Sequence, residues 1–182
     1  LGANTLTLSG GGRFSNTNHL DLNNASSKLL LNSITVDNVS TTSDSLGLDV
    51  DNDSTVSSLS VAHITPVSIA SGSSLSGAIT VSAGSLKLTE AGELASTISM
   101  SGGVLDADNS STLSGTLTQA GNITIDVADD KTLTYSGTAL SLGANTLTLS
   151  GGGRFSNTNH LDLNNASSKL LLNSITVDNV ST

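Results

Sequence analysis

A right-handed parallel β-solenoid (β-helix) is the all-β fold that this sequence predicts, with about 19–20 residues in each coil. Three observations lead to it. The composition is poor in aromatic residues and in the helix formers Glu, Lys, Arg and Gln, short apolar segments alternate with turn residues at a regular spacing, and a long stretch of sequence occurs twice. Together they indicate a chain that buries many small side chains by stacking one coil on the next.

The composition is unsuited to an ordinary globular core. The chain has no Trp and no Cys, and its only aromatic side chains are Phe14, Tyr135 and Phe155. A compact globule draws much of its buried area from large aromatic residues. The helix formers Glu, Lys, Arg and Gln are scarce, whereas Ser, Thr, Asn, Asp and Gly are abundant. We therefore expect strands and turns throughout and no helix.

Short segments of alternating apolar and polar residues recur along the chain, which is the pattern of half-buried strands. Stretches such as GGG, DNDS, SAGS, EAGE, DNSS and QAGN separate them and are typical of turns. The predicted strands are TLTL at 5, LDL at 20, LLL at 29, ITV at 34, LGLDV at 46, LSV at 59, VSI at 67, ITV at 79, LKL at 86, TIS at 97, VLDA at 104, TLT at 116, ITIDV at 123, TLTY at 132 and LSL at 140.

The spacing of these strands indicates coils. From residue 48 onward the strand centres alternate in steps of about 12 and about 7 residues, so two strands take about 19 residues. One such coil cannot bury its apolar face alone, but a stack of coils can, with strands about 4.8 Å apart. The right-handed winding follows from the preferred hand of parallel crossovers.

Two local expectations follow from the pattern. In the segment 46–50, Leu46, Leu48 and Val50 are expected to point into the solenoid. Pro66 lies in AHITPVSI. Because proline has no N–H to donate, we expect Pro66 at a corner between two strands.

The long repeat defines the organisation of the chain. The segments 1–41 and 142–182 are identical, so one period runs from 1 to 141. Identity over turns as well as strands exceeds what a fold requires and indicates a recent duplication. We expect 1–141 to be one full tandem repeat of about seven coils and 142–182 to begin the next, within a longer array. Seven coils would rise by roughly 34 Å.

Five aspartates are candidate calcium ligands: Asp49, Asp51 and Asp53 in one cluster, and Asp106 and Asp108 in another. Alternating carboxylates suit a hard cation that needs several oxygen ligands. Serines occupy the places where a helix-loop-helix calcium site needs its glycine and its bidentate glutamate. The alternative is that these are solvated carboxylates at strand ends.

The sequence predicts no enzyme. Glycoside cleavage needs a pair of carboxylates. Asp129 with Asp130, or the 106–108 pair, are the residues available for it. Side chains that would hold a sugar, aromatic or basic, are almost absent. Thr-x-Thr triplets recur, but at no constant spacing, so we expect no continuous threonine array.

The charge limits the partners. The net charge is −9, and there are only six basic residues. This balance argues against binding to nucleic acid or to an anionic membrane. No apolar run is long enough to span a membrane. The expected partners are stacked repeats of the same chain, with other fibres or surface glycans beside them.

The segments SGGG, TLTL, NITIDV and DADNSSTLSGTLTQAGN resemble the repetitive regions of bacterial surface adhesins, namely autotransporter passengers, filamentous-haemagglutinin-like proteins and giant tandem-repeat proteins. The resemblance implies a secreted β-helical stalk at the cell surface, with a role in adhesion, biofilm or extracellular matrix.

The predicted function is accordingly a structural extracellular fibre or stalk. The alternative is a repeat module that binds glycans or cations (Ca²⁺ at the aspartates above). A string of β-sandwich domains, one per period, is the rival architecture, although such domains usually contain an aromatic core residue.

Overall fold

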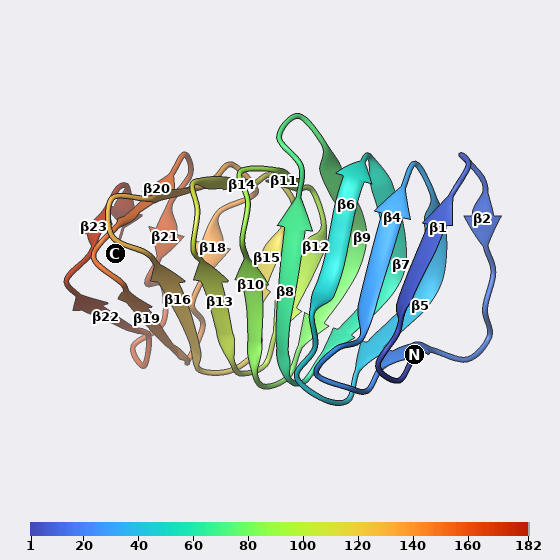
Figure 1. Ribbon diagram of the computed structural model, residues 1–182. Helices are drawn as coiled ribbons and strands as arrows, with labels where there is room; N and C mark the ends of the chain where they lie inside the picture. The colour runs from blue at the N-terminus through green and yellow to red at the C-terminus, as the bar shows by residue number, and fades with distance from the viewer. Residues whose placement is uncertain (182) are drawn as a thin grey trace.

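The computed structural model describes residues 1–181, and these residues form a right-handed parallel β-solenoid of nine coils. In Figure 1 the strands of one sheet run upward in front, the chain returns behind them, and successive coils advance from the N-terminus at the right to the C-terminus at the left. Every strand pairing is parallel, as in β1 with β4 and β7 with β9. The predicted fold class is confirmed, and β-sandwich domains, whose strands pair antiparallel, are excluded.

The first sheet contributes one strand to each coil and forms one side of the solenoid. Its nine strands, in spatial order, are β1 (Thr5–Ser9), β4 (Lys28–Asn32), β6 (Gly47–Asn52), β8 (Ile64–Ile69), β10 (Ser85–Leu88), β13 (Val104–Ala107), β16 (Ile123–Val127), β19 (Thr146–Ser150) and β22 (Lys169–Asn173).

The second and third sheets close the rest of the coil. The main path of the second sheet is β2 (Arg13–Phe14), β5 (Thr35–Thr41), β7 (Ser54–Val61), β9 (Ser74–Val81), β11 (Glu93–Leu94), β14 (Ser111–Leu113), β17 (Thr132–Tyr135), β20 (Arg154–Asn157) and β23 (Thr176–Val177). Beside it lie β3 (Leu20–Leu22), β12 (Thr97–Met100) and β15 (Leu117–Gln119), and the third sheet is β18 (Leu140–Ser141), β21 (Leu161–Asp162) and β24 (Val180–Ser181).

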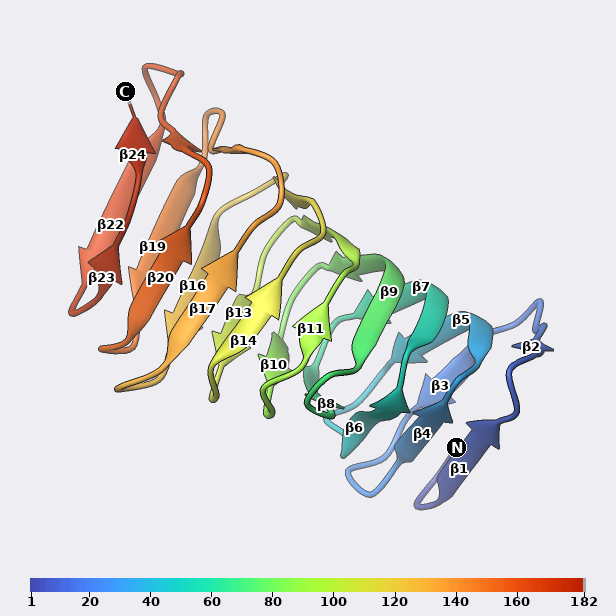
Figure 2. The ribbon, with the colours of Figure 1, turned by 90° about the horizontal axis from the view of Figure 1, so that it is seen from above.

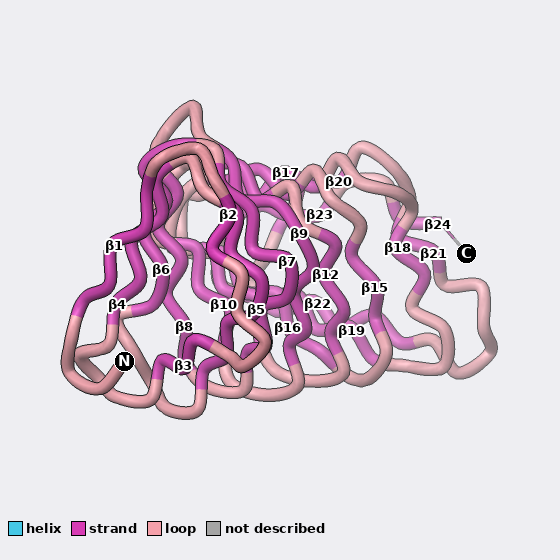
Figure 3. The backbone as a smooth tube through the Cα atoms, turned by 90° about the vertical axis from the view of Figure 1, so that its right-hand side faces the viewer, coloured by secondary structure: helices cyan, strands magenta, loops and turns pink. Residues whose placement is uncertain are grey.

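The shape of the coil changes along the axis, as the view from above shows (Figure 2). In the next coil two shorter strands, β11 and β12, take the place of the long strand β9, and both pair with it. Each later coil is therefore broken into shorter straight pieces. In the end view the strands occupy the sides of the solenoid, and loops form much of its lower edge and some of its upper corners (Figure 3).

The register gives the coil length. The step between facing residues of the first sheet ranges from 19, between Ser85 and Val104, to 24, between Ile123 and Leu147. Seven such steps lead from β1 to β19, and both strands read TLTLS. One period of the sequence therefore takes seven coils, as the strand spacing predicted.

The core consists of aliphatic ladders parallel to the axis. One ladder runs through Leu86, Leu105, Ile125 and Leu149, each fully buried, and continues to Leu172, which is 56% exposed on the last coil. Each buried side chain is covered by its equivalents one coil below and one coil above. Strands stacked about 4.8 Å apart leave room for Leu, Ile and Val in this arrangement, which accounts for the missing tryptophan.

Two local expectations are wrong. Leu46 is 53% exposed, because β6 begins only at Gly47. Pro66 lies inside β8 and not at a corner. The preceding coil accommodates the proline with a glycine, since Gly47 has a φ of +78° and a Cβ there would lie 1.8 Å from the Pro66 carbonyl oxygen. Only glycine allows so close an approach of two backbones. Leu48 and Val50 point inward as expected.

Candidate functional site

The first aspartate cluster does not converge on one point. The Asp49 carboxylate is 2.5 Å from the Lys28 ammonium on the outer face of the first sheet. The Asp53 carboxylate accepts hydrogen bonds from both the backbone N–H and the hydroxyl of Ser74, at 2.8 and 3.1 Å. Asp51 is exposed. These aspartates therefore act separately, and two of them tie neighbouring coils together.

The second aspartate pair surrounds a lysine. The Lys87 ammonium donates to Asp106 at 3.0 Å and to Asp108 at 2.8 Å, from one coil to the next. The hydrogen bond to Asp108 is the main reason that the pKa of Lys87 is raised. Burial raises the pKa of Asp106, and the lysine opposes that change. Lys87 occupies the place between the two carboxylates that a cation would otherwise take.

The calcium sites stay a prediction. Within residues 1–181 no group of three or more His, Asp or Glu side chains is arranged to hold a metal ion. The sequence alone does not reveal the lysines that pair with Asp49, Asp106 and Asp108. They lie 19 to 21 residues away along the chain, and they contact the aspartates because one coil has about that length.

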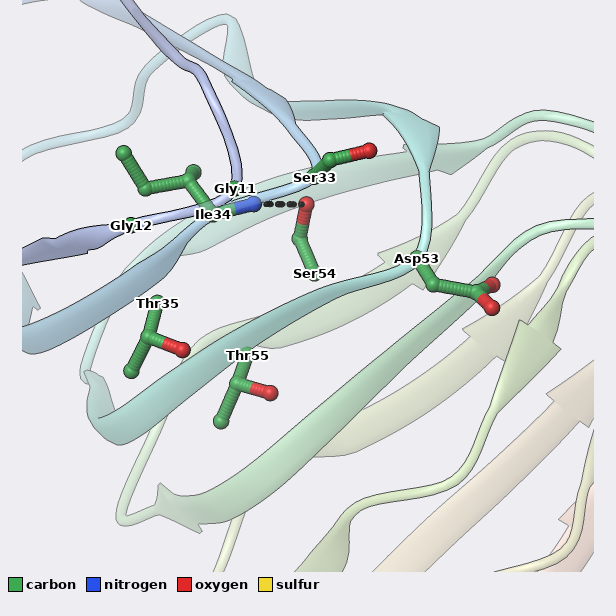
Figure 4. Close-up of a pocket in the computed structure, with 8 residues that line it drawn as sticks. All are labelled: Gly11, Gly12, Ser33, Ile34, Thr35, Asp53, Ser54 and Thr55. Carbon is green, nitrogen blue, oxygen red and sulfur yellow. Dashed lines mark hydrogen bonds between the residues drawn. The ribbon is translucent and has the colours of Figure 1, made fainter.

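A groove of two adjoining hollows follows the corner between the first and second sheets, and Asp53 belongs to both. The first hollow has a volume of about 220 Å³ and is shown in Figure 4; the second has about 290 Å³. Their linings are Gly11, Gly12, Ser33, Ile34, Thr35, Asp53, Ser54 and Thr55, and Asp53, Gly72, Ser73, Ser74, Ala91, Gly92, Glu93 and Thr112.

The groove is lined by polar side chains that are already engaged. The buried Ser54 hydroxyl accepts from the Ile34 N–H at 3.4 Å and donates to the Asn52 carbonyl at 2.9 Å (Figure 4). Asp53 points away from the other labelled side chains in Figure 4, and it also lines the second hollow. Glu93 accepts from the hydroxyl of Ser114. This chemistry suits hydrogen bonding to a small polar ligand, and it lacks the aromatic platform that sugars favour.

A larger hollow, of about 630 Å³, lies where the later coils bend between β14 and β15 and between β17 and β18. Two glycines form the bend. A Cβ on Gly115 would lie 1.9 Å from the Ser96 carbonyl oxygen, and one on Gly137 would lie 2.2 Å from the Gly115 carbonyl oxygen. The hollow is thus a consequence of close backbone stacking at a corner, and its remaining lining is mostly hydroxyl groups.

One outer face presents a row of hydroxyl groups that the strand pattern did not predict. Ser40, Ser60, Thr80, Ser99 and Thr118 face one another on five successive coils of the second sheet. The Thr-x-Thr triplets do not create this row, because they are distributed over different sheets. The row becomes visible only once the register is known, since its serines and threonines share no sequence motif.

Comparison of the chain with protein-family models, with curated proteins and with solved structures finds no match. No helix among residues 1–181 has the length and hydropathy needed to cross a membrane. The fold and the surfaces described above are therefore the grounds for the function proposed next.

Proposed function

We propose that this chain is a structural extracellular fibre or stalk of a bacterial cell surface, which supports adhesion or an extracellular matrix. The observation that carries the proposal is the placement of the two identical segments. Residues 1–41 and the described part of 142–182 occupy equivalent positions, seven coils apart, in one continuous stack. Repetition of the period therefore adds coils to the same stack and so adds length.

The contacts between coils suit a mechanical role. Backbone hydrogen bonds join each coil to the next, as from the Leu46 N–H to the Ser27 carbonyl oxygen and from the Ser82 N–H to the Val61 carbonyl oxygen. The aliphatic ladders run in the same direction and bury the interior continuously. The chain has a net charge of −9. Like charge on the surface would keep neighbouring fibres apart.

The proposal assigns the chain no catalytic step, and it makes length the property on which function depends. A solenoid lengthens in proportion to the number of repeats, by roughly 34 Å for each period of seven coils. A flexible chain lengthens only with the square root of the residue number. The alternative, a glycan- or cation-binding module, would use the corner groove and would not depend on length.

The experiment is surface display with one, two and three periods of the sequence between a membrane anchor and a peptide tag at the tip. The height of the tag above the cell surface, measured by axial localisation microscopy, is expected to rise by equal steps of roughly 34 Å. Matched versions without the tag are tested for binding to glycan-coated surfaces with and without calcium. Steps that shrink with each added period, or glycan binding by the tagless chains, would contradict the stalk and favour the binding module.

A further inference from the structure

Seven Asn-x-Ser/Thr triplets occur along the chain. They begin at Asn24, Asn38, Asn52, Asn109, Asn122, Asn165 and Asn179. This triplet is the acceptor motif for N-linked sugars, and an acceptor lies on a surface loop. The asparagine Nδ2 and the hydroxyl group two residues later must both reach the active site of a glycosyltransferase, so the fold decides which triplets can serve as acceptors.

The triplets at Asn38 and Asn179 are equivalent in the two copies, and their amide nitrogens are engaged. Asn38 lies in β5, and its Nδ2 donates to the Asn16 carbonyl oxygen at 2.7 Å. The Asn179 Nδ2 donates in the same way to the Asn157 carbonyl oxygen. An amide nitrogen that the neighbouring coil holds is not presented to a transferase, so these two triplets are poor acceptors.

Three further triplets are closed by burial or by strand pairing. Those at Asn52 and Asn109 end in Ser54 and Ser111, which are only 4% and 6% exposed. The triplet at Asn122 has its last two residues in β16, which pairs with a strand on each side. A buried hydroxyl group is out of reach of an enzyme, and a paired strand cannot enter an active site as a loop does.

The triplet at Asn24 and its copy at Asn165 are accessible. All three residues of each triplet are exposed, in the loops that join β3 to β4 and β21 to β22. The Asn24 Oδ1 accepts from the Ser26 N–H at 2.9 Å, and the Asn165 Oδ1 accepts from the Ser167 N–H at 2.9 Å. Among residues 1–181 these side chains thus use their oxygen and leave Nδ2, the atom that would receive a sugar, without a hydrogen bond.

Coils on both sides hold the first of these loops, which lies at the lower edge of Figure 1, where the chain enters β4. The buried Ser27 donates its hydroxyl to the Gly2 carbonyl oxygen in the preceding coil, and its carbonyl oxygen accepts from the Leu46 N–H in the following coil. In the second copy the Ser168 hydroxyl donates to the Gly143 carbonyl oxygen. The exposure of the triplet is therefore a property of the loop within the stack.

We propose that Asn24 and Asn165 are acceptors for an N-linked sugar and that the fold makes the other triplets inaccessible. The donor is a sugar linked through its anomeric carbon to a nucleotide or lipid diphosphate. The asparagine Nδ2 forms a bond to the anomeric carbon, the bond from that carbon to the phosphate oxygen breaks, and the diphosphate leaves with the electron pair. One Nδ2 proton passes to a base of the transferase, and no group is oxidised or reduced.

The two sites lie on the same edge of the solenoid, because one period takes seven coils. Modification would place a sugar on that edge at intervals of roughly 34 Å. After transfer Oδ1 is still an amide oxygen, so the bond from the Ser26 N–H to Asn24 persists and the loop keeps its shape. The inference goes beyond the stalk function and does not depend on it, since a sugar on a loop does not change the reach of the chain.

Glycopeptide mass spectrometry of the protein isolated from the cells that make it is the direct test. Trypsin releases both sites in one peptide sequence, FSNTNHLDLNNASSK, from residues 14–28 and 155–169. This peptide is expected to carry a sugar on the asparagine of NAS, and the peptides that contain Asn52 and Asn109 are expected to be unmodified. A peptide FSNTNHLDLNNASSK without any sugar, or a sugar on Asn52 or Asn109, would overturn the proposal.

A second experiment separates the two copies, using the purified folded chain with a soluble asparagine glucosyltransferase and UDP-glucose. Intact-mass measurement is expected to show two added hexoses on the parent chain. Ser26→Ala and Ser167→Ala should each lose one of them, because each removes a hydroxyl group at an exposed position and keeps the asparagine. Ser26→Thr is the matched control and should keep both. No transfer to the parent, or two hexoses on either alanine variant, would contradict the assignment.

A trypsin digest of the same chain tests the role of the fold. Without strands and burial, the peptides that contain Asn52 and Asn109 are expected to accept glucose as well. A digest that is modified only at the NAS peptide would show that the sequence and not the fold selects the sites, and would overturn that part of the proposal. None of these results bears on the stalk function, whose test measures reach along a single chain.

Discussion

Residues 1–41 and 142–182 have the same sequence and different surroundings. Phe155 is fully buried, whereas Phe14, its equivalent, is 37% exposed; Leu31 is fully buried, whereas Leu172 is 56% exposed. The early part of the second copy lies on preceding coils, and the late part of the first copy lies beneath following coils. Burial in this solenoid therefore depends on the neighbouring coil, and a coil's own sequence does not determine it.

The largest effect is expected at the phenylalanines. Phe155→Ala should lower the free energy of unfolding by about 3–5 kcal/mol, because it removes a large buried side chain and leaves a cavity. Phe14→Ala should cost less than about 1 kcal/mol, since its side chain is partly exposed. Urea denaturation followed by circular dichroism measures both.

The pair Leu31 and Leu172 is the control, because here the buried residue belongs to the first copy and the exposed one to the second. Leu31→Ala should cost about 2–5 kcal/mol and Leu172→Ala much less, so here the first copy is the sensitive one. A general weakness of one end of the chain would make the same copy sensitive at both pairs. Equal losses within each pair would show that position in the stack does not decide burial.

A smaller difference is expected in the ion pairs of the two copies. The pKa of Asp37 is lowered, first by the Ser15 hydroxyl that donates to it at 2.8 Å and then by Arg13. The pKa of Asp178 is also lowered, but there Arg154 is the main cause. Ser15→Ala should therefore raise the pKa of Asp37 more than Ser156→Ala raises that of Asp178.

Carboxyl-carbon NMR across an acid titration measures these pKa values, with Arg154→Gln as the variant that should move Asp178 most. Because both carboxyl pKa values are lower in the folded state, both groups stabilise the fold above the ordinary carboxyl range. That contribution is lost as the pH falls through the lowered values. A larger rise at Asp178 than at Asp37 on serine removal would reverse the assignment of causes.

The fold could be predicted from the sequence because each strand alternates on its own. The alternation of apolar and polar residues in TLTL, LKL and ITIDV predicts a strand at each, and the spacing of such segments predicts the coil length. The pattern does not reveal β11 and β14. These strands have only two and three residues, within EAGELAS and DNSSTL, and so short a strand beside turn residues shows no clear alternation of apolar and polar positions. The wrong expectation at Leu46 has a related cause, since a pattern of period two does not show where a strand begins.

Contacts between coils could not be predicted in the same way. Two features depend on a register whose step changes from coil to coil: the contact of Lys87 with both aspartates of the second pair, and the row of hydroxyl groups on one face. An error of one residue moves a side chain to the other face of its strand. The composition predicts the class of the core, but the register determines each partner.

Hydrogen exchange of β4 and β22, which share the sequence KLLLN, tests most directly whether the neighbouring coil protects a strand. The Lys28 N–H donates to Asn4 in the preceding coil and the Ser27 carbonyl accepts from Leu46 in the following one. The backbone N–H groups along a parallel strand point alternately to its two neighbours. Those of Leu29 and Leu31 therefore point toward β6, whereas those of Leu170 and Leu172 point away from β19, to the side of the last coil that no described strand covers.

Residue-resolved exchange by NMR measures the backbone amides of both strands in the unmodified chain. The Leu170 and Leu172 amides are predicted to exchange at least about 100-fold faster than those of Leu29 and Leu31. The Leu171 amide, which faces β19, should differ less from that of Leu30. Equal exchange at all equivalent positions would contradict the account, because protection would then follow the local sequence and not the coil above it.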